Sequence, residues 1–349
     1  MQISCINESG KTMSENQKFE ECKKTIEDCK KEISKRIIGQ EQVINGILTA
    51  VICGGHVLLE GVPGLAKTLA VKTLAEISNL DFKRIQFTPD LLPADIIGTL
   101  IYEQGNAKFS ARKGPIFTNV VLADEINRSP AKVQSALLEA MAEHQVTIGE
   151  ETYKLPEPFF VLATQNPIDQ EGTYNLPEAE LDRFLLKVVV TYPSPQEEVQ
   201  IVKTAGKASG VQVSKILSQE KISEFRSLLN EVACDDKLVE YIVSIISATR
   251  PVQEKKASGR LSVRVSSVRK DDIAKYISFG ASPRAGIALL QCAKVQAMFS
   301  GRNFVLPEDI KAAAPNVLRH RLVLSYEAAA DEVTSDDIIA KILNLMPLP

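Results

Sequence analysis

The spacing of apolar positions along the chain separates two kinds of element. Between residues 18 and 35, apolar side chains recur at steps of three and four residues, which predicts a helix with one buried face. These side chains are Phe19, Cys22, Ile26, Cys29 and Ile33. From residue 57 onward, the continuous apolar runs HVLL, VVLADE, FFVLATQNP and LLKVVVTY alternate with helical patterns. Because such runs are typical of strands buried on both faces, we predict a parallel sheet covered by helices.

Two stretches interrupt the alternation of strands and helices. The first, GTLIYEQGNAKFSARKGPIF, predicts a pair of hairpin strands inserted into a helix. The second, VTIGEETYKL, predicts a hairpin that turns at Gly149 and Glu150.

A change of pattern marks a domain boundary near residue 192. The stretch TYPSPQEE is punctuated by two prolines, and beyond it the pattern is almost purely helical. We therefore predict an α/β domain over residues 18–192 and a smaller all-α domain over residues 193–349. Residues 1–17 are polar and are predicted to form a disordered tail. Translation could begin at Met1 or at Met13, and the sequence does not decide between them.

The composition excludes several classes of protein. The net charge of −3 gives no global basic field of the kind that nucleic-acid binders carry. The six cysteines are scattered without a C-x-x-C pair, which favours reduced thiols over disulfides or a zinc site. No apolar run approaches the ~18 residues of a membrane span, so no direct membrane insertion is expected. These features predict a soluble, cytoplasmic protein.

The stretch from residue 61 to 69, GVPGLAKTL, nearly spells the phosphate-binding pattern G-x-x-x-x-G-K-[ST]. A strand-like run precedes it and a helical pattern follows, as a phosphate loop requires. Ala66 replaces the second glycine, at a cost of about 1–2 kcal/mol if the residue needs a positive φ. A glycine-rich turn that binds nothing is the alternative. The candidate nucleotide-binding residues are Gly61, Val62, Pro63, Gly64, Leu65, Ala66, Lys67, Thr68 and Leu69.

Within this loop, two residues have specific expected tasks. Lys67 is expected to contact the β- and γ-phosphates of a nucleotide, and Thr68 to place its hydroxyl on Mg²⁺. Together they predict that the cofactors are a nucleoside triphosphate and Mg²⁺.

Two further strand ends supply candidate groups for hydrolysis. Asp124 ends an apolar strand and is a candidate Mg²⁺ ligand, partly through water. Glu125 is a candidate base that orients and deprotonates water, a role typically worth roughly 10²–10⁴-fold in rate. Asn166 follows another strand, and its amide could hold the attacking water or the γ-phosphate. The alternatives are an acidic helix cap for the two carboxylates and a plain Asn-Pro turn for Asn166.

Two arginines complete the candidate site. Arg183 lies in LPEAELDRF, and Arg284 lies in GASPRAG, where Ser282 predicts a helix N-cap and Pro283 the first helical residue. An arginine in the first turn opposes the helix dipole, which a bound phosphate would explain. Surface ion pairs are the alternative. The basic stretch of residues 250–270 has no aromatic residues for base stacking, so a solvated loop is favoured over a nucleic-acid site.

Taken together, these motifs resemble those of the MoxR family of AAA+ ATPases. The resemblance runs from about Glu32 to the C-terminus and includes RIIGQEQVI, QFTPDLLPADIIG, KGPIFTNVVLADEINR, ATQNP, LPEAELDRF and FGASPRA. The alanine before the lysine in GVPGLAKT is similar to the family's own form of the loop. The basic stretch before ISFGASPRA is longer than the family pattern, which leaves the surface of the helical domain in doubt.

The resemblance implies a fold and a set of roles. The fold is an AAA+ core with a five-stranded parallel sheet and a helical lid, and the two hairpins match the family's helix-2 and pre-sensor-1 inserts. By the same resemblance, Ile38 and Gly39 line the adenine pocket, Asn166 is sensor 1 and Arg284 is sensor 2. Arg183 resembles the arginine finger that reaches the ATP of a neighbouring subunit.

The implied activity is Mg²⁺-dependent ATP hydrolysis in a homo-oligomeric ring of six subunits. In that mechanism the nucleotide changes the angle between the α/β domain and the lid. The resemblance implies a chaperone-like role in maturing protein complexes, with a von Willebrand factor A-domain partner and a protein client. The alternatives are a nucleic-acid-translocating motor, a small-molecule kinase with a phosphate loop, and a nucleotide-gated scaffold with little turnover.

Overall fold

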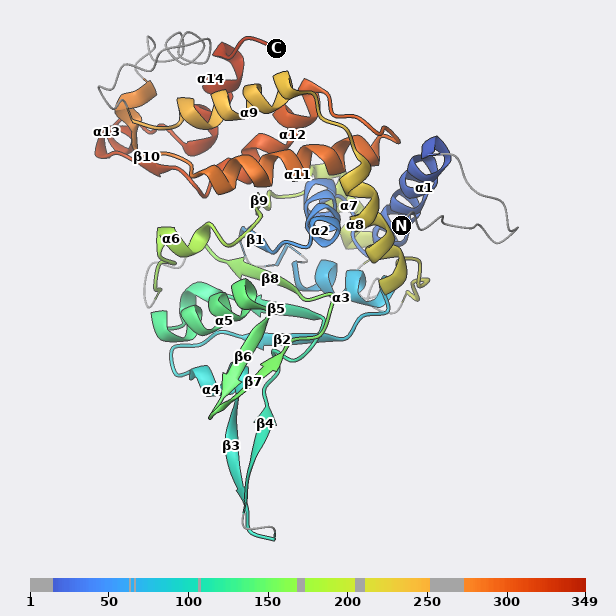
Figure 1. Cartoon of the computed structure of the whole chain (residues 1–349), viewed down its shortest axis with the longest axis vertical. Helices are drawn as coiled ribbons and strands as arrows, with labels where there is room; N and C mark the ends of the chain where they lie inside the picture. Colours follow the sequence, from blue (N-terminus) through green and yellow to red (C-terminus); the bar gives the residue numbers. More distant parts are fainter. Residues whose placement is uncertain are drawn as a thin grey trace.

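Five parallel strands form the central sheet of the protein, in the order β2-β5-β8-β1-β9 (Figure 1). The computed structural model describes residues 15–62, 64–65, 67–105, 108–167, 173–204, 211–251 and 273–349. The strands of this sheet are β1 (Val57–Glu60), β2 (Phe82–Gln86), β5 (Val120–Asp124), β8 (Phe160–Gln165) and β9 (Leu186–Val189). The predicted parallel sheet is confirmed.

Side chains of each central strand alternate between two hydrophobic cores. On β1, Val57 and Leu59 face the core that contains α1, α2 and α3, whereas Leu58 faces the core formed with α4 and α5. This arrangement explains why the central strands begin with continuous apolar runs instead of alternating apolar and polar residues. The helices are α1 (Glu15–Ser34), α2 (Glu41–Cys53), α3 (Lys67–Ile77), α4 (Pro93–Ile97) and α5 (Ala131–Glu143).

The edge strand β2 was not among the strands that the apolar runs predict. Its sequence, FKRIQ, contains one buried residue, Ile85. An edge strand that buries so little apolar surface lacks the continuous run by which the other strands are recognised.

Helix α1 has the predicted buried face. Phe19, Cys22, Ile26, Cys29 and Ile33 are each no more than 2% exposed. The helix begins at Glu15, so residues 15–17 are helical rather than part of a disordered tail, while residues 1–14 lie outside the described residues. No helix in the described part of the chain is long and apolar enough to span a membrane.

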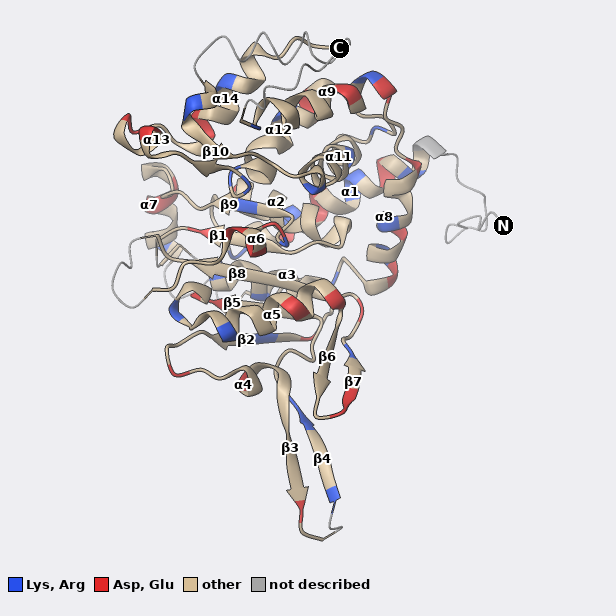
Figure 2. Cartoon of the chain, turned by 60° about the vertical axis from the view of Figure 1, so that its left-hand side comes forward, with Lys and Arg blue, Asp and Glu red and all other residues tan. Residues whose placement is uncertain are grey.

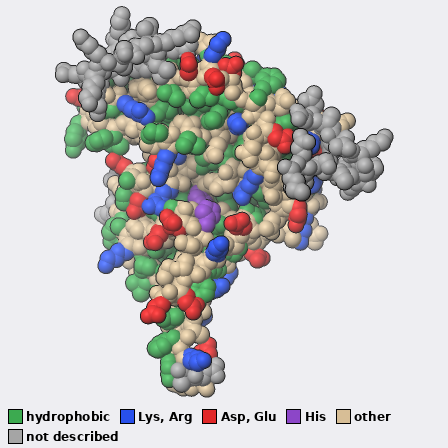
Figure 3. Space-filling model, viewed as in Figure 1, with side chains coloured by type: hydrophobic (Ala, Val, Ile, Leu, Met, Phe, Trp, Pro, Cys, Tyr) green, Lys and Arg blue, Asp and Glu red, His purple; other side chains and the backbone are tan. Residues whose placement is uncertain are grey.

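Both predicted hairpins are present. Strands β3 (Gly98–Glu103) and β4 (Lys108–Lys113) project from the body, and hydrophobic side chains cover part of this projection (Figures 1 and 3). Strands β6 (Gln145–Ile148) and β7 (Glu151–Lys154) turn at Gly149 and Glu150. The expectation that the first hairpin interrupts a helix is wrong. Helix α4 precedes it, but the described residues 114–119, which lead to β5, contain no helix.

Beyond β9 the described chain is mainly helical, as predicted. The helices are α7 (Pro195–Thr204), α8 (Gln219–Glu231), α9 (Asp236–Ala248), α11 (Pro283–Phe299), α12 (Pro307–Leu318), α13 (Tyr326–Ala330) and α14 (Ser335–Leu345). The pattern did not reveal the short antiparallel pair β10 (Ile277–Phe279) and β11 (Val323–Leu324). Residues 252–270 of the basic stretch lie outside the described residues.

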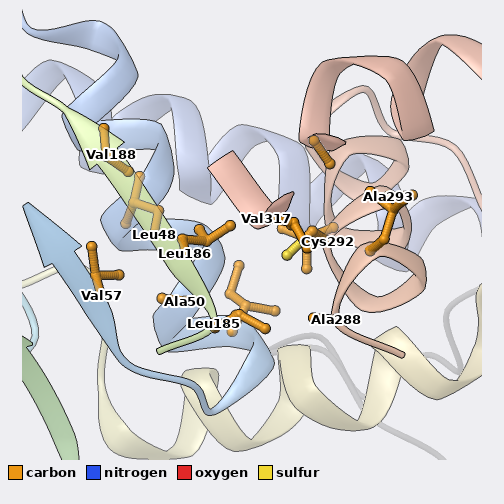
Figure 4. Packing of buried hydrophobic residues seen from close by; sticks show 14 of the residues in the cluster. Leu48, Ala50, Val57, Leu185, Leu186, Val188, Ala288, Cys292, Ala293 and Val317 are labelled. Atoms are coloured by element: carbon orange, nitrogen blue, oxygen red, sulfur yellow. The ribbon is translucent and has the colours of Figure 1, made fainter. Parts of the chain in front are cut away.

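The helical half, which is the described part of residues 193–349, and the central sheet share one hydrophobic core. In Figure 4, side chains of β9 and α2 lie between Val57 of β1 and the side chains of α11 and α12. The labelled residues are Leu48, Ala50, Val57, Leu185, Leu186, Val188, Ala288, Cys292, Ala293 and Val317. The helical half therefore packs directly against α2 and β9 of its own chain.

Candidate functional site

A cavity of about 360 Å³ opens where three neighbouring strands end. Strands β5, β8 and β1 are adjacent and parallel, so their carboxyl ends lie at one edge of the sheet, where α/β folds bind ligands. The lining residues are Gly64, Leu65, Lys67, Thr68, Leu69, Asp124, Glu125, Thr164 and Asn166. All of them except Thr164 are residues that the sequence predicts to bind or hydrolyse a nucleotide.

The loop after β1 has two positions that require glycine. At Gly61, a Cβ atom would lie 2.8 Å from the carbonyl oxygen of Val190, which is too close for any side chain. Gly64 has φ of +86°, in the left-handed region that favours glycine, although no atom of the described residues would lie within 4 Å of a Cβ there. Val62 follows Gly61, whereas Pro63 and Ala66 lie outside the described residues.

Lys67 is the first residue of α3, so its charge lies at the start of an 11-residue helix. Its Nζ atom donates a hydrogen bond to the carbonyl oxygen of Gly61. Burial lowers the pKa of Lys67, and the nearby charges of Asp124, Glu125 and Glu60 oppose that change. A half-buried cation beside the amino end of a helix is well placed to bind phosphate oxygens.

Asp124 ends β5 and is held by two neighbouring strands. Its Oδ1 atom accepts a hydrogen bond from Thr164 Oγ1 of β8 at 2.6 Å. Its Oδ2 atom accepts from Arg84 of β2, at 2.9 Å from Nε and 2.6 Å from Nη2. These bonds hold the Asp124 carboxylate in place at the cavity wall. Thr68, which carries a hydroxyl, lines the same cavity.

Glu125 has a backbone conformation that is uncommon for a residue other than glycine. Its φ is +57° and its ψ is +51°, and its N–H donates to Thr164 Oγ1 at 2.8 Å. Its Oε2 atom accepts hydrogen bonds from Gln86 Nε2 at 2.9 Å and Arg128 Nη1 at 3.0 Å. Such outliers occur often at functional sites, where the surrounding structure maintains them.

Asn166 follows β8 directly and lines the same cavity. The side chain is buried, and its backbone carbonyl accepts a hydrogen bond from Asn127 Nδ2 at 3.3 Å. The cavity thus brings together an amide, two carboxylates, a lysine and two hydroxyls. This set of side chains fits a nucleoside triphosphate with a hard divalent cation such as Mg²⁺.

Ile38 and Gly39 lie outside the residues that line this cavity. They belong to the loop between α1 and α2, where Gly39 has φ of +70° and packs against the Glu197 carboxylate at the start of α7. Next to them, Gln40 Nε2 donates to the carbonyl oxygen of Thr191 at 2.9 Å. Their contribution to an adenine pocket stays a prediction.

Arg183 and Arg284 are both exposed, and neither lines the cavity of its own chain. Arg183 follows the short acidic helix α6 (Glu178–Leu181; Figure 2), and its Nη1 atom donates to the carbonyl oxygen of Leu138 at 3.0 Å. Arg284 lies in the first turn of α11, whose N-cap is Ser282 as predicted. The two arginine-bearing segments are joined, because Ser282 Oγ donates to Asp182 Oδ2 at 3.1 Å.

Sequence reasoning did not find four residues that hold the two carboxylates: Arg84, Gln86, Arg128 and Thr164. Arg84 and Gln86 lie on β2, where Gln86 is in register with Asp124. That register joins positions that are distant along the chain. Thr164 carried a usable signal, because it is the polar residue two positions before Asn166 in ATQNP.

Comparisons with known proteins agree with this geometry. A model described as the ATPase family associated with various cellular activities (AAA) matches residues 56–186, and an AAA lid domain model matches residues 269–342. The chain is 45% identical over 325 residues to Chaperone MoxR1 of Mycobacterium tuberculosis, covering 93% of this chain and 82% of the relative. It is 29% identical over 336 residues to Protein MoxR of Methylorubrum extorquens, covering 91% and 94%. A crystal structure from Cytophaga hutchinsonii matches with a TM-score of 0.85 at 47% identity, covering 95% of this chain and 97% of that one. The chain therefore belongs to the MoxR family of AAA+ ATPases.

Proposed function

We propose that this chain hydrolyses ATP with Mg²⁺ at the edge of its central sheet. The observation that carries the proposal is the single cavity that gathers Lys67, Thr68, Asp124, Glu125 and Asn166. A nucleotide-binding module without turnover has no need for a second carboxylate next to Asp124. Membership of an ATPase family supports the same activity.

Each residue has a role that follows from its position. Lys67 and the N–H groups of the loop bind the phosphates, and Thr68 and Asp124 hold Mg²⁺, which supplies positive charge to the phosphate oxygens. Glu125, fixed by Gln86, orients and deprotonates the attacking water. Asn166 contacts the γ-phosphate or that water.

The two arginines are proposed to act on the ATP of a neighbouring subunit. Both are exposed and both lie outside the cavity of their own chain, where Lys67 is the one basic side chain among the described lining residues. An arginine supplied by a neighbour typically contributes roughly 10³–10⁵ in rate. We therefore propose a homo-oligomeric ring, with six subunits as the expected number, in which isolated subunits are nearly inactive.

The cellular task is proposed by analogy with the family. The relative Chaperone MoxR1 is named as a chaperone, and we propose that this chain remodels or matures a protein client. A von Willebrand factor A-domain protein is the proposed partner, and the cytoplasm is the proposed location. Residues 18–192 are proposed as the nucleotide-binding domain and residues 193–349 as the lid.

The first test measures ATP turnover per subunit over a wide range of protein concentration, with Mg²⁺ and without a client. We expect specific activity to rise with concentration, in step with assembly followed by sedimentation. Activity that stays constant while the sedimentation coefficient shows dissociation would contradict a site completed by a neighbour. Absence of turnover in assembled rings would favour the nucleotide-gated scaffold. Salt-sensitive stimulation by DNA or RNA would favour the translocating motor.

The second test assigns Glu125 and Arg183 to different sides of one interface. Glu125→Gln is expected to bind ATP but to hydrolyse little, and Arg183→Ala is expected to have little activity alone. Mixed rings of the two variants contain interfaces with an intact Glu125 and an intact Arg183. We therefore expect mixing to restore part of the turnover. Rings that contain both variants and show no restored turnover would remove Arg183 from the neighbour's site.

A further inference from the structure

The segment that carries Arg183 is fastened to the helical half by a buried arginine. Arg321 follows α12, and its side chain is 4% exposed. It donates to Asp182 Oδ1 at 2.6 Å, to the carbonyl oxygen of Phe184 at 2.7 Å and to that of Leu185 at 3.1 Å. A buried guanidinium with so many acceptors fixes the backbone on both sides of Arg183.

The same carboxylate also reaches the segment that carries Arg284. While Oδ1 of Asp182 accepts from Arg321, Oδ2 accepts from Ser282 Oγ at 3.1 Å. Ser282 is the N-cap of α11, two residues before Arg284. The side chain of Asp182, the residue before Arg183, therefore bonds directly to the start of the helix that bears Arg284.

The hydroxyl of Ser282 is used differently from those of comparable residues. At the N-caps of α8, α13 and α14, Ser218, Ser325 and Thr334 accept a hydrogen bond from an N–H group of their own helix. Ser282 also occupies an N-cap, but its side chain makes no such bond and donates instead to Asp182. The ordinary capping role, which stabilises a helix, thus does not explain this hydroxyl.

We propose that Asp182 is a positioning residue that fixes the position of Arg183 relative to Arg284, so that both side chains can contact the ATP phosphates of the neighbouring subunit at the same time. The proposal rests on the function proposed above for the two arginines. It adds that they act as one unit whose geometry depends on the bond between Ser282 and Asp182. Misplacing a charged group by about 1 Å is enough to cost on the order of 10²-fold in rate.

Ser282→Ala removes this bond while leaving the ion pair between Asp182 and Arg321 in place. We expect about a tenfold lower kcat, with the KM for ATP within about twofold of the wild type and an unchanged melting temperature. Ser282→Thr retains a hydroxyl and should restore most of the kcat. The matched control is Ser218→Ala, which removes an N-cap hydroxyl from α8 and should leave kcat unchanged.

Mixed rings separate damage to a subunit's own site from misplaced arginines. Subunits with Glu125→Gln and Ser282→Ala hydrolyse little themselves but present their arginines to wild-type neighbours. We expect wild-type sites in such rings to turn over several-fold more slowly than wild-type sites mixed with Glu125→Gln alone. Equal turnover in the two mixtures would overturn the proposal, as would a wild-type kcat for Ser282→Ala or the same loss in the threonine variant.

Failure of this inference can be told apart from failure of the proposed function. If mixing Arg183→Ala with Glu125→Gln restores turnover, the trans role of Arg183 stands whatever Ser282→Ala does. If that mixing restores nothing, the role of Arg183 itself is lost, and the inference about Asp182 falls with it.

Discussion

Replacing Thr164 by valine tests whether one hydroxyl holds both the carboxylate of Asp124 and the backbone of Glu125. Thr164 is 1% exposed, and its Oγ1 atom donates to Asp124 Oδ1 at 2.6 Å and accepts from the N–H of Glu125 at 2.8 Å. Valine has the same branched shape and nearly the same volume, so packing is retained while both hydrogen bonds are lost. The substitution therefore isolates the contribution of the hydroxyl.

The expected magnitude follows from these two bonds. A hydrogen bond to a charged group contributes about 1.5–3 kcal/mol to stability, and leaving a buried donor without a partner costs about 1–3 kcal/mol. The two effects share one oxygen and do not simply add, and the N–H of Glu125 is only partly buried. We therefore expect the free energy of unfolding to fall by on the order of 3 kcal/mol, roughly a hundredfold in the equilibrium constant.

Urea unfolding of Thr164→Val, followed by far-UV circular dichroism because the chain has no tryptophan, measures this loss. Thr164→Ser is the matched control, because it keeps the hydroxyl and loses only a methyl group, at about 1 kcal/mol. ATP turnover should fall at least tenfold in the valine variant and much less in the serine variant. Equal unfolding midpoints and equal turnover for the two variants would refute the assignment of Thr164.

Three further outcomes are expected. Phe19→Ala should cost about 3–5 kcal/mol in unfolding free energy because the ring is fully buried, whereas Val202→Ala, at a side chain 73% exposed, should leave the urea midpoint nearly unchanged. Gly61→Ala should weaken binding of a fluorescent ATP analogue at least tenfold, since a Cβ has no room there. Gly105→Ala should bind the analogue normally, because no atom of the described residues would lie within 4 Å of its Cβ. Burial lowers the pKa of His56 from 6.5 to about 4, so below pH 6.5 the unfolded chain takes up a proton that the folded chain does not. Stability should therefore fall between pH 6.5 and 4, by about 1.4 kcal/mol per pH unit from this group, and His56→Gln should flatten that slope in urea unfolding.

Periodicity predicted the elements whose burial is regular. The stripe on α1 and the apolar strands β1, β5, β8 and β9 were recognisable because most inward positions are filled by apolar residues. Strand β2 was missed because, at the edge of the sheet, it buries only Ile85. The strands β10 and β11, with three and two residues, are too short to show any period.

Some residues of the candidate site could likewise be predicted from local patterns, and others could not. Lys67, Asp124, Glu125 and Asn166 lie at or after the carboxyl end of a recognisable strand, so the parallel sheet alone is enough to bring them together. The groups that hold the carboxylates depend instead on which strands are neighbours. Arg84 reaches Asp124 because β2 pairs with β5, and that pairing joins residues 40 positions apart. No local pattern encodes such a contact.

The hydrophobic core shared by the two domains limits the conformational change that a bound nucleotide could cause within one subunit. A lid that swings against its own α/β domain would have to separate α11 from α2 and α12 from β9, where Leu48, Leu186, Cys292 and Val317 are almost fully buried. Exposing one such side chain costs about 1.5–3 kcal/mol, so a wide opening would use much of the stability of the chain. The bonds from Arg321 to residues 182–185 oppose the same motion. A large change in the angle between the two domains of one subunit, as the sequence leads us to expect, would therefore cost much free energy. In the proposed ring, motion between whole subunits, with Arg183 and Arg284 at the proposed boundary, would require none of this core to open.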